Sequence, residues 1–520
     1  MATLTSIGHA GLAIESSAFT LVCDPWMSPY GAYLGSWFQF PRNDHLDITS
    51  LTSATYVAIS HEHLDHMDSW FLERLSDETT VLIPAYPSNT FADRIRECGV
   101  KKIIEINSWE PFPLDNGDSW ITTIPQLSPM YHDSAFLIVA EGRSVLNCND
   151  AKLIASQTRR AKHLAGGRLD VMAVQASSAT WHPMCYSYPM EEQRRIAMEK
   201  RISKLRAVQR LIRATAPELA VPFAGPPCFL DPELRDINWV LDTEHGAFVH
   251  PEAAKSWLSE HLPGQAWETL RPGDRIDLET GDVVRDPVSA EFDFTEEVEE
   301  YIQNYAEHRA EIIEKIGVTY PEPGPDFPER FVNHFVRLGT LSSYFLEQID
   351  MTVRFEITGP NGGVWDVRMN ADGLAIGPAT TEKPGYTIIV QGRWVEPILT
   401  GDVAWEDLLL SLRLRLDRDP DVYNGYLAGL LKHANAPALQ AVEEYETGRD
   451  ETERITVTDG GRTFEIGRYC PHAGEDLSIS AIIEDGKVYC LGHNFTFDLV
   501  TGECVNARCT PLATREISTS

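Results

Sequence analysis

One turn near the start of the chain carries four side chains of the kinds that bind metal ions. His61, His63, Asp65 and His66 directly follow the β-branched and aromatic run 55–59, which predicts a buried strand. Imidazole and carboxylate suit zinc, iron or manganese, and the alternating spacing allows the first two histidines to hold one ion while the other two residues face a second. A polar turn that is rich in histidine by chance is the alternative, and it does not explain the spacing. The chain is therefore predicted to bind metal where a strand ends.

The turn resembles the metal-binding motif of the metallo-β-lactamase fold. The resemblance implies an αββα sandwich, in which two sheets pack face to face and helices cover their outer faces. The sequence agrees, because runs of strand and helix character alternate after the turn. Helices are predicted at 68–75 and 89–98, and strands at 79–84, 102–106, 120–124 and 134–139. Residues 4–14 and 19–26 are predicted to form a hairpin that precedes the turn.

Two residues of that hairpin are candidates to support the metal ligands. Asp24 ends the second predicted strand, where its carboxylate can accept the spare ring N–H of a ligating histidine and fix the tautomer. A plain turn aspartate before Pro25 is the alternative. His9 follows the first strand, and it either lines the same pocket or packs as a structural residue.

Three residues further along the chain are candidates to complete the metal site. His132 lies in a polar loop before an apolar strand and is predicted to be a third ligand of the first metal, with a surface histidine as the alternative. Asp150 follows the strand predicted at 144–148, where it could bridge two metals or cap the next helix. His182 follows the strand predicted at 171–175 and is expected to complete the second metal site.

The charge of the chain limits its partners. Its 520 residues carry a formal net charge of −33, so nucleic acid or an anionic membrane would be repelled over most of the surface. An anionic substrate needs a local cluster of Arg or Lys, and the helix predicted over 190–215 carries such a run. That run either binds an anionic ligand or forms a solvated helix face. An acidic exterior also suits the docking of a basic electron-donor protein.

The length predicts about three domains in one chain. No stretch of about 18 uncharged apolar residues is present, so we expect no membrane span and a cytoplasmic location. The region 286–435 is predicted to be α+β, with antiparallel strands near 351–357 and 364–369 and an amphipathic helix over 405–416. It shows no titratable cluster with the spacing of ligands or of a catalytic triad. A lid, a scaffold and a substrate-contacting module all remain open for it.

A second cluster of ligands lies near the C-terminus. Cys470 and His472 on one predicted loop and Cys490 and His493 on another offer what a Rieske 2Fe-2S centre needs, which is two thiolates on one iron and two imidazoles on the other. A zinc finger would have paired cysteines instead of two Cys and His pairs. The surrounding residues resemble the Rieske fold. Rieske proteins of the cytochrome bc complexes carry an extra Cys in each loop, and these loops do not, so the cluster resembles the lower-potential type that feeds oxygenases.

Together, the two sites resemble those of the CMP-N-acetylneuraminate hydroxylases, which combine a Rieske domain with a metallo-β-lactamase-fold domain. Further similar stretches are Asp24-Pro25-Trp26, 221–225, 271–273 and 415–423. The resemblance implies hydroxylation with O2 and electrons from a small redox protein and a pyridine-nucleotide reductase. Two departures limit what can be transferred. The Rieske domain follows the sandwich instead of preceding it, and the match is loose around His132 and His182.

We therefore predict an α+β multidomain chain with a sandwich over 1–285, an α+β middle region over 286–435, a linker over 436–452 and an all-β Rieske domain over 453–515. The predicted activity is a Rieske-coupled non-haem iron monooxygenase that hydroxylates or N-oxygenates a small polar substrate. Its mononuclear or dinuclear iron would act with O2, and a ferredoxin, flavodoxin or cytochrome-type donor with an NAD(P)H reductase would supply electrons. Assembly into a homo-oligomer is left open.

Two other functions fit the same residues. A zinc-dependent phosphodiesterase or lactonase would use metal-bound water and keep the Rieske domain as an accessory. An electron-transfer protein with a binding module in place of the catalytic domain is the third reading, and the intact four-ligand turn argues against it.

Overall fold

The computed structural model describes residues 2–127, 129–130, 132–177, 180–294, 298–472, 474–490 and 495–517. The first part of the chain forms two facing sheets. In order across the first sheet, the strands are β16 (Val283–Val284), β15 (Arg275–Asp277), β1 (Thr3–Gly8), β2 (Gly11–Glu15), β3 (Thr20–Cys23), β5 (Tyr56–Ala58), β6 (Thr80–Pro84) and β7 (Lys102–Ile106). Those of the second are β13 (Leu219–Phe223), β12 (Val171–Gln175), β11 (Arg143–Asn147), β10 (Ser134–Ala140), β9 (Trp120–Pro125) and β8 (Phe112–Pro113).

Alternation along the strands creates a separate core on each side of the second sheet. In β10, Phe136 and Ile138 pack between the two sheets, whereas Ala135 and Leu137 point to the outer face. This is the period of two that a strand buried on both faces requires. The outer face is covered by α4 (Ala155–Leu164), α5 (Met190–Thr215) and α6 (Pro251–His261).

Shorter helices complete the sandwich. The outer face of the first sheet packs against α1 (Ile48–Thr52), α2 (Ser69–Leu72) and α3 (Thr90–Glu97). Small elements at the rim are β4 (Phe38–Gln39), β14 (Pro227–Cys228) and two short 3-10 helices, η1 (Arg235–Leu241) and η2 (Ser289–Glu291). The order helix, sheet, sheet, helix confirms the predicted αββα arrangement.

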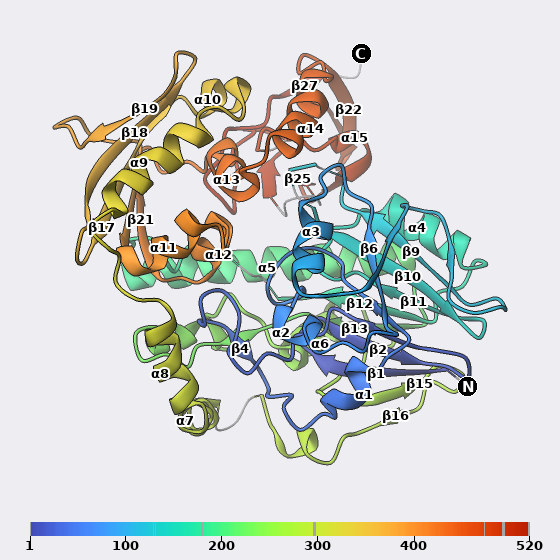
Figure 1. Ribbon diagram of the computed structural model, residues 1–520. Helices are drawn as coiled ribbons and strands as arrows, with labels where there is room; N and C mark the ends of the chain where they lie inside the picture. Colours follow the sequence, from blue (N-terminus) through green and yellow to red (C-terminus); the bar gives the residue numbers. More distant parts are fainter. Residues whose placement is uncertain are drawn as a thin grey trace.

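The middle region has its own sheet and helices (Figure 1, yellow to orange). The strand order is β19 (Gly373–Pro378), β18 (Gly363–Asn370), β17 (Met351–Thr358), β20 (Tyr386–Gln391) and β21 (Leu414–Arg418). The helices are α7 (Val298–His308), α8 (Ala310–Thr319), α9 (Phe327–Leu338), α10 (Ser343–Ile349), α11 (Gly392–Thr400), α12 (Trp405–Leu410) and α13 (Gly425–His433). The helix predicted over 405–416 is wrong in its second half. It ends at Leu410, and Leu412 has a φ of 58°, which turns the chain into strand β21.

The C-terminal region is rich in short strands. Helix α14 (Ala436–Thr447) occupies most of the expected linker over 436–452. Two three-stranded sheets follow, β22 (Arg454–Asp459), β23 (Arg462–Gly467) and β27 (Thr514–Ile517) in one, and β24 (Ala481–Glu484), β25 (Lys487–Cys490) and β26 (Phe495–Asp498) in the other. The one-turn helix α15 (Leu477–Ser480) lies between them in sequence. The domain boundaries themselves stay a prediction.

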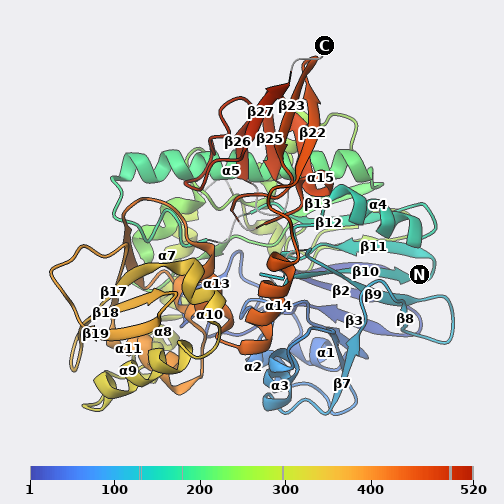
Figure 2. The ribbon, with the colours of Figure 1, turned by 90° about the horizontal axis from the view of Figure 1, so that it is seen from above.

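The regions share buried contacts. Trp37 of the sandwich donates from its indole Nε1 to the carbonyl oxygen of Leu410 in the middle region at 2.8 Å. Arg210 of α5 packs its guanidinium 3.5 Å from the ring centroid of Tyr489 in the C-terminal region. Figure 2 shows α5 running beneath the C-terminal strands. Within the described residues, no helix is both long and apolar enough to cross a membrane.

Candidate functional site

Strand pairing brings the predicted ligands to one edge of the sandwich. β3 and β5 are parallel, with Cys23 opposite Ala58, so Asp24 and the turn over 59–68 leave the first sheet at the same edge. The turn is closed by the Asp68 carboxylate, which accepts from the backbone N–H of Met27 at 2.7 Å. In the second sheet, β10 begins and antiparallel β11 ends at the facing edge.

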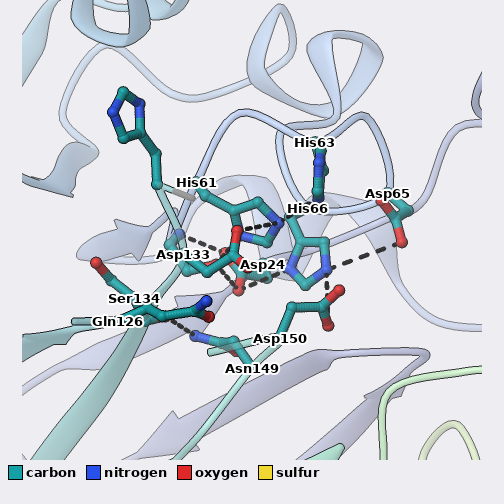
Figure 3. A network of polar contacts seen from close by, with 12 residues as sticks. Asp24, His61, His63, Asp65, His66, Gln126, Asp133, Ser134, Asn149 and Asp150 are labelled. Carbon is teal, nitrogen blue, oxygen red and sulfur yellow. Dashed lines mark hydrogen bonds and ion pairs between the residues drawn. The ribbon is translucent and has the colours of Figure 1, made fainter. Parts of the chain in front are cut away.

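Asp24 fixes the orientation of two histidine rings (Figure 3). Its Oδ2 lies 3.0 Å from Nδ1 of His66 and accepts from the hydroxyl of Ser60 at 2.6 Å. The Ser60 Oγ in turn lies 2.8 Å from Nδ1 of His61. This network is satisfied when both histidines carry their proton on Nδ1, which leaves both Nε2 atoms to face the pocket as metal ligands.

One group of candidate ligands is His61, His63 and Asp133, whose ligand atoms lie within 4.8 Å of one another. Nε2 of His61 lies 2.7 Å from Nδ1 of His63 and 3.9 Å from Oδ1 of Asp133. Burial and the two neighbouring imidazoles His66 and His63 lower the pKa of His61 to about 4. A neutral imidazole is the form that coordinates a metal ion.

A second group shares the other side of the pocket. Nε2 of His66 lies 3.5 Å from Oδ1 of Asp150 and 3.8 Å from Oδ2 of Asp65. Asp65 is held by His9, whose Nε2 lies 2.8 Å from its Oδ2, and by the hydroxyl of Tyr33, which donates to its Oδ1. Although burial alone would raise the pKa of the Asp65 carboxyl, His66 and His9 hold it well below its usual range.

The pocket fits one or two metal ions. The Nε2 of His66, the Oδ1 of Asp133 and the Oδ1 of Asp150 are buried and have no hydrogen-bond partner. Buried polar atoms in proteins are normally paired, so three unpaired atoms facing one pocket are what a bound cation would satisfy. The donors are imidazole and carboxylate, a set that suits iron, zinc and manganese.

The middle region adds a residue that the sequence did not reveal. Oε2 of Glu406, on α12, lies 3.2 Å from Nε2 of His63, and Glu406 also pairs with Lys432 of α13 at 3.1 Å. Burial would lower the pKa of His63, but Glu406 raises it to about 9. A carboxylate on the ring nitrogen opposite the metal is the usual support of a ligating histidine.

Two predicted ligands lie apart from these groups. The His132 ring stacks on Tyr86, with ring centroids 5.0 Å apart, and its neighbour Asp133 faces the pocket instead. Nε2 of His182 lies 3.4 Å from the hydroxyl of Tyr188. Neither histidine shares a ligand group with the others in the part of the chain that the structure describes.

The C-terminal ligand set lies on two loops. Cys470 opens a tight turn in which its N–H donates to the carbonyl oxygen of Glu475 at 2.8 Å, and Cys490 ends β25. Both cysteines are buried, and the ring of His472 packs 4.2 Å from that of Phe495. The predicted fourth ligand, His493, lies outside the described residues. Two buried thiols and an imidazole fit three of the four ligands of a Rieske cluster.

Cys504 and Cys509, which follow this cluster, are free thiols. No disulfide joins two cysteines within the described residues.

One cavity of about 270 Å³ joins both sites. Its wall includes His63, Asp65, Asp133 and Asp150 of the metal pocket and His472 of the cluster loop. The ring of Tyr423, which precedes α13, lies 5.2 Å from that of His472 and also lines the cavity. The two ligand sets of a single chain therefore face a shared space.

Comparison with known proteins agrees with this architecture. Residues 435–516 match the Rieske [2Fe-2S] domain. Over 97% of its length the chain is 29% identical to a putative Rieske 2Fe-2S iron-sulfur protein of Mycolicibacterium smegmatis, of which it covers 98%. It is 22% identical to the cytidine monophosphate-N-acetylneuraminic acid hydroxylase of Pan troglodytes, with 81% of this chain and 70% of that protein covered.

Among solved structures, CmlA, a diiron β-hydroxylase from Streptomyces venezuelae, is 19% identical with a TM-score of 0.36, covering 55% of this chain and 54% of that one. Igni18, a metallo hydrolase from Ignicoccus hospitalis, is 16% identical with a TM-score of 0.35, covering 53% of this chain and 97% of that one. The chain therefore joins an αββα sandwich to a C-terminal region that matches the Rieske domain, and the predicted similarity to CMP-N-acetylneuraminate hydroxylases is confirmed.

Proposed function

We propose that this chain is a Rieske-coupled, iron-dependent monooxygenase that hydroxylates, or oxygenates on nitrogen, a small polar substrate. The observation that carries the proposal is the single cavity lined by the metal pocket and by His472. A Rieske cluster passes one electron at a time and does not bind substrate, so its place beside a metal pocket is useful where that pocket performs redox chemistry. The similarity to a hydroxylase over most of the chain supports the same class.

The residues of the pocket would have distinct roles in binding the metal ions. His61, His63 and Asp133 would hold one ion. His66, Asp65 and Asp150 would hold a second, because the two carboxylates lie 3.8 and 3.5 Å from Nε2 of His66. Iron bound there would supply the redox chemistry with O2 that zinc lacks. Asp24 and Ser60 would keep Nε2 of His61 and His66 deprotonated, and Glu406 would hold the ring of His63.

Electrons would reach the cluster from outside the chain. A ferredoxin, flavodoxin or cytochrome-type protein with an NAD(P)H reductase is the donor that the resemblance implies, and we propose that the chain meets it in the cytoplasm. The strongly negative net charge of −33 favours a donor with a basic docking face.

The donor set also suits zinc, so a zinc-dependent phosphodiesterase or lactonase is the second candidate. Metal analysis with EPR on anaerobically purified protein, before and after dithionite, separates the two. We expect iron beyond the two cluster atoms, a reduced-Rieske signal, and a second iron signal that changes when O2 is admitted. The His61→Ala variant should keep the cluster iron and lose the ion that His61, His63 and Asp133 would hold. Zinc in the pocket, with iron confined to the cluster, would support the hydrolase and overturn the proposal.

A further inference from the structure

The cavity has a cationic wall in a strongly acidic protein. Six basic side chains line it. They are Lys152, Lys200, Lys204, Arg418, Lys432 and Arg508. Of the four acidic residues in the same lining, Asp65, Asp133 and Asp150 belong to the metal pocket, and Glu406 is engaged by His63 and Lys432. Arg418 is paired with Asp421 at 2.6 Å, and Arg508 lies 3.9 Å from the same carboxylate, so we consider Lys200 and Lys204 as the cations of this wall that a ligand could join.

Helix α5 supplies two of these cations from a single face. Lys200 and Lys204 are four residues apart, so their side chains lie one above the other. Nζ of Lys200 donates to the carbonyl oxygen of His182 at 3.1 Å, and Nζ of Lys204 to Oε1 of Gln175 at 2.5 Å. Both acceptors are neutral. Among the described residues, neither ammonium group has a carboxylate within 4.0 Å, and each has further N–H donors to offer.

Lys152, in the segment after β11, adds a third charge to this wall. Burial, followed by the charges of Arg418 and Lys152, lowers the pKa of Lys200 to about 7. Burial and the charge of Lys152 likewise lower the pKa of Lys204 to about 8. Lys200 and Lys204 line the cavity and donate only to neutral acceptors, so an anion bound in the cavity would stabilise both ammonium groups.

We infer that Lys200 and Lys204 form a subsite for an oxyanion, a phosphate or carboxylate group, of the substrate. The inference rests on the proposed function, because that function makes this cavity the substrate site. Trp181 and Tyr423 line the same space, so their rings offer contact to the uncharged part of the molecule. The solvent-facing cations of α5 differ from this pair. Arg195, for example, is bound by Glu192 and Glu199.

Calorimetric titration of the metal-loaded full chain tests the subsite with three probes that share a phenyl ring. Phenyl phosphate and benzoate carry the two oxyanions, and phenol carries none. We expect one or both anions to bind and phenol to bind at least tenfold more weakly. Lys200→Gln and Lys204→Gln should each weaken anion binding about tenfold, and Lys200→Arg should restore part of it. Arg206→Gln is the matched control, because Arg206 lies on the exposed side of the same helix.

Three results would overturn the inference. Phenol could bind as tightly as the anions, or Arg206→Gln could weaken binding as much as the lysine variants do. Anion binding could also be lost in His61→Ala and unchanged in Lys200→Gln, which would put the anion on the metal. Iron content and the reduced-cluster EPR signal are recorded for every variant. Failure of the proposed oxygenase would appear in those signals, whereas failure of the subsite would appear in binding alone.

Discussion

At the scale of single residues, the orientation of the pocket histidines depends on the polar groups that contact the ring nitrogens facing away from the pocket. Asp24 serves His66 directly and His61 through Ser60, all within the sandwich. His63 differs, because its support, Glu406, comes from the middle region. One ligand ring thus depends on a part of the chain more than 300 residues away.

Replacing Glu406 by Gln tests that dependence. The change keeps the size of the side chain and removes the charge beside Nε2 of His63. Because outer-shell carboxylates orient and strengthen ligating histidines, we expect the affinity for Fe(II) to fall about 10-fold to 100-fold. Anaerobic Fe(II) titration of the metal-depleted pocket measures this, with Glu347→Gln, on an exposed position of α10, as the control. Equal affinity in a folded Glu406→Gln protein would assign Glu406 a purely structural role.

The sequence predicted the four-ligand turn because its side chains are contiguous, and it pointed to Asp24 and Asp150 because each follows a strand. It selected His132 where Asp133 faces the pocket. Neighbouring side chains of an extended segment point to opposite sides, so a shift of one residue exchanges a ligand for a stacking ring. Glu406 left no local pattern, since its position depends on how α12 packs against the sandwich.

At the scale of elements, α5 connects the site to the C-terminal domain. One face carries Lys200 and Lys204 into the cavity. Further along, Nε of Arg210 lies 3.0 Å from Oε2 of Glu484, and its guanidinium packs on Tyr489, the residue before the cluster ligand Cys490. The basic run therefore has two sides, because Lys200 and Lys204 line the cavity whereas Arg206 and Arg213 are exposed to solvent. Whether the first side binds an anion stays a prediction.

The Arg210→Met variant tests this connection. We expect the C-terminal domain to lose about 2 kcal/mol of stability, because a desolvated cation contact with an aromatic ring is removed. The visible absorbance of the cluster, followed during thermal unfolding, should then be lost at a lower temperature than in the unaltered chain. Arg213→Met, on an exposed position of the same helix, should leave the temperature of cluster loss unchanged. If the cluster were lost at the same temperature in both variants, the Arg210 contact would not stabilise the C-terminal domain.

At the scale of the whole molecule, the reversed domain order does not separate the two sites. The order of the domains along the sequence does not say whether electrons would pass within a chain or between subunits, because linear order does not determine distance in the folded protein. Because one cavity is lined by residues of both sites, we predict a path within one chain.

Co-expression of two inactive variants tests this path. Cys470→Ser removes a proposed cluster ligand, and His61→Ala removes a proposed ligand of the metal pocket. If each electron moves within its own chain, mixed assemblies should consume no more O2 with a reductant than the sum of the two variants alone. Recovery of activity in the mixture, with both proteins folded, would establish transfer between subunits.

The shared cavity also has a consequence for how the protein is made. The turn over 61–66 is synthesised about 400 residues before the cluster loops, which at roughly 5–20 residues per second is an interval on the order of tens of seconds. Throughout it, the metal pocket lacks the wall that contains His472. The histidines of the turn are therefore synthesised before the domain that would deliver electrons to the pocket. The order of translation thus allows the pocket to bind its ion before that ion can be reduced.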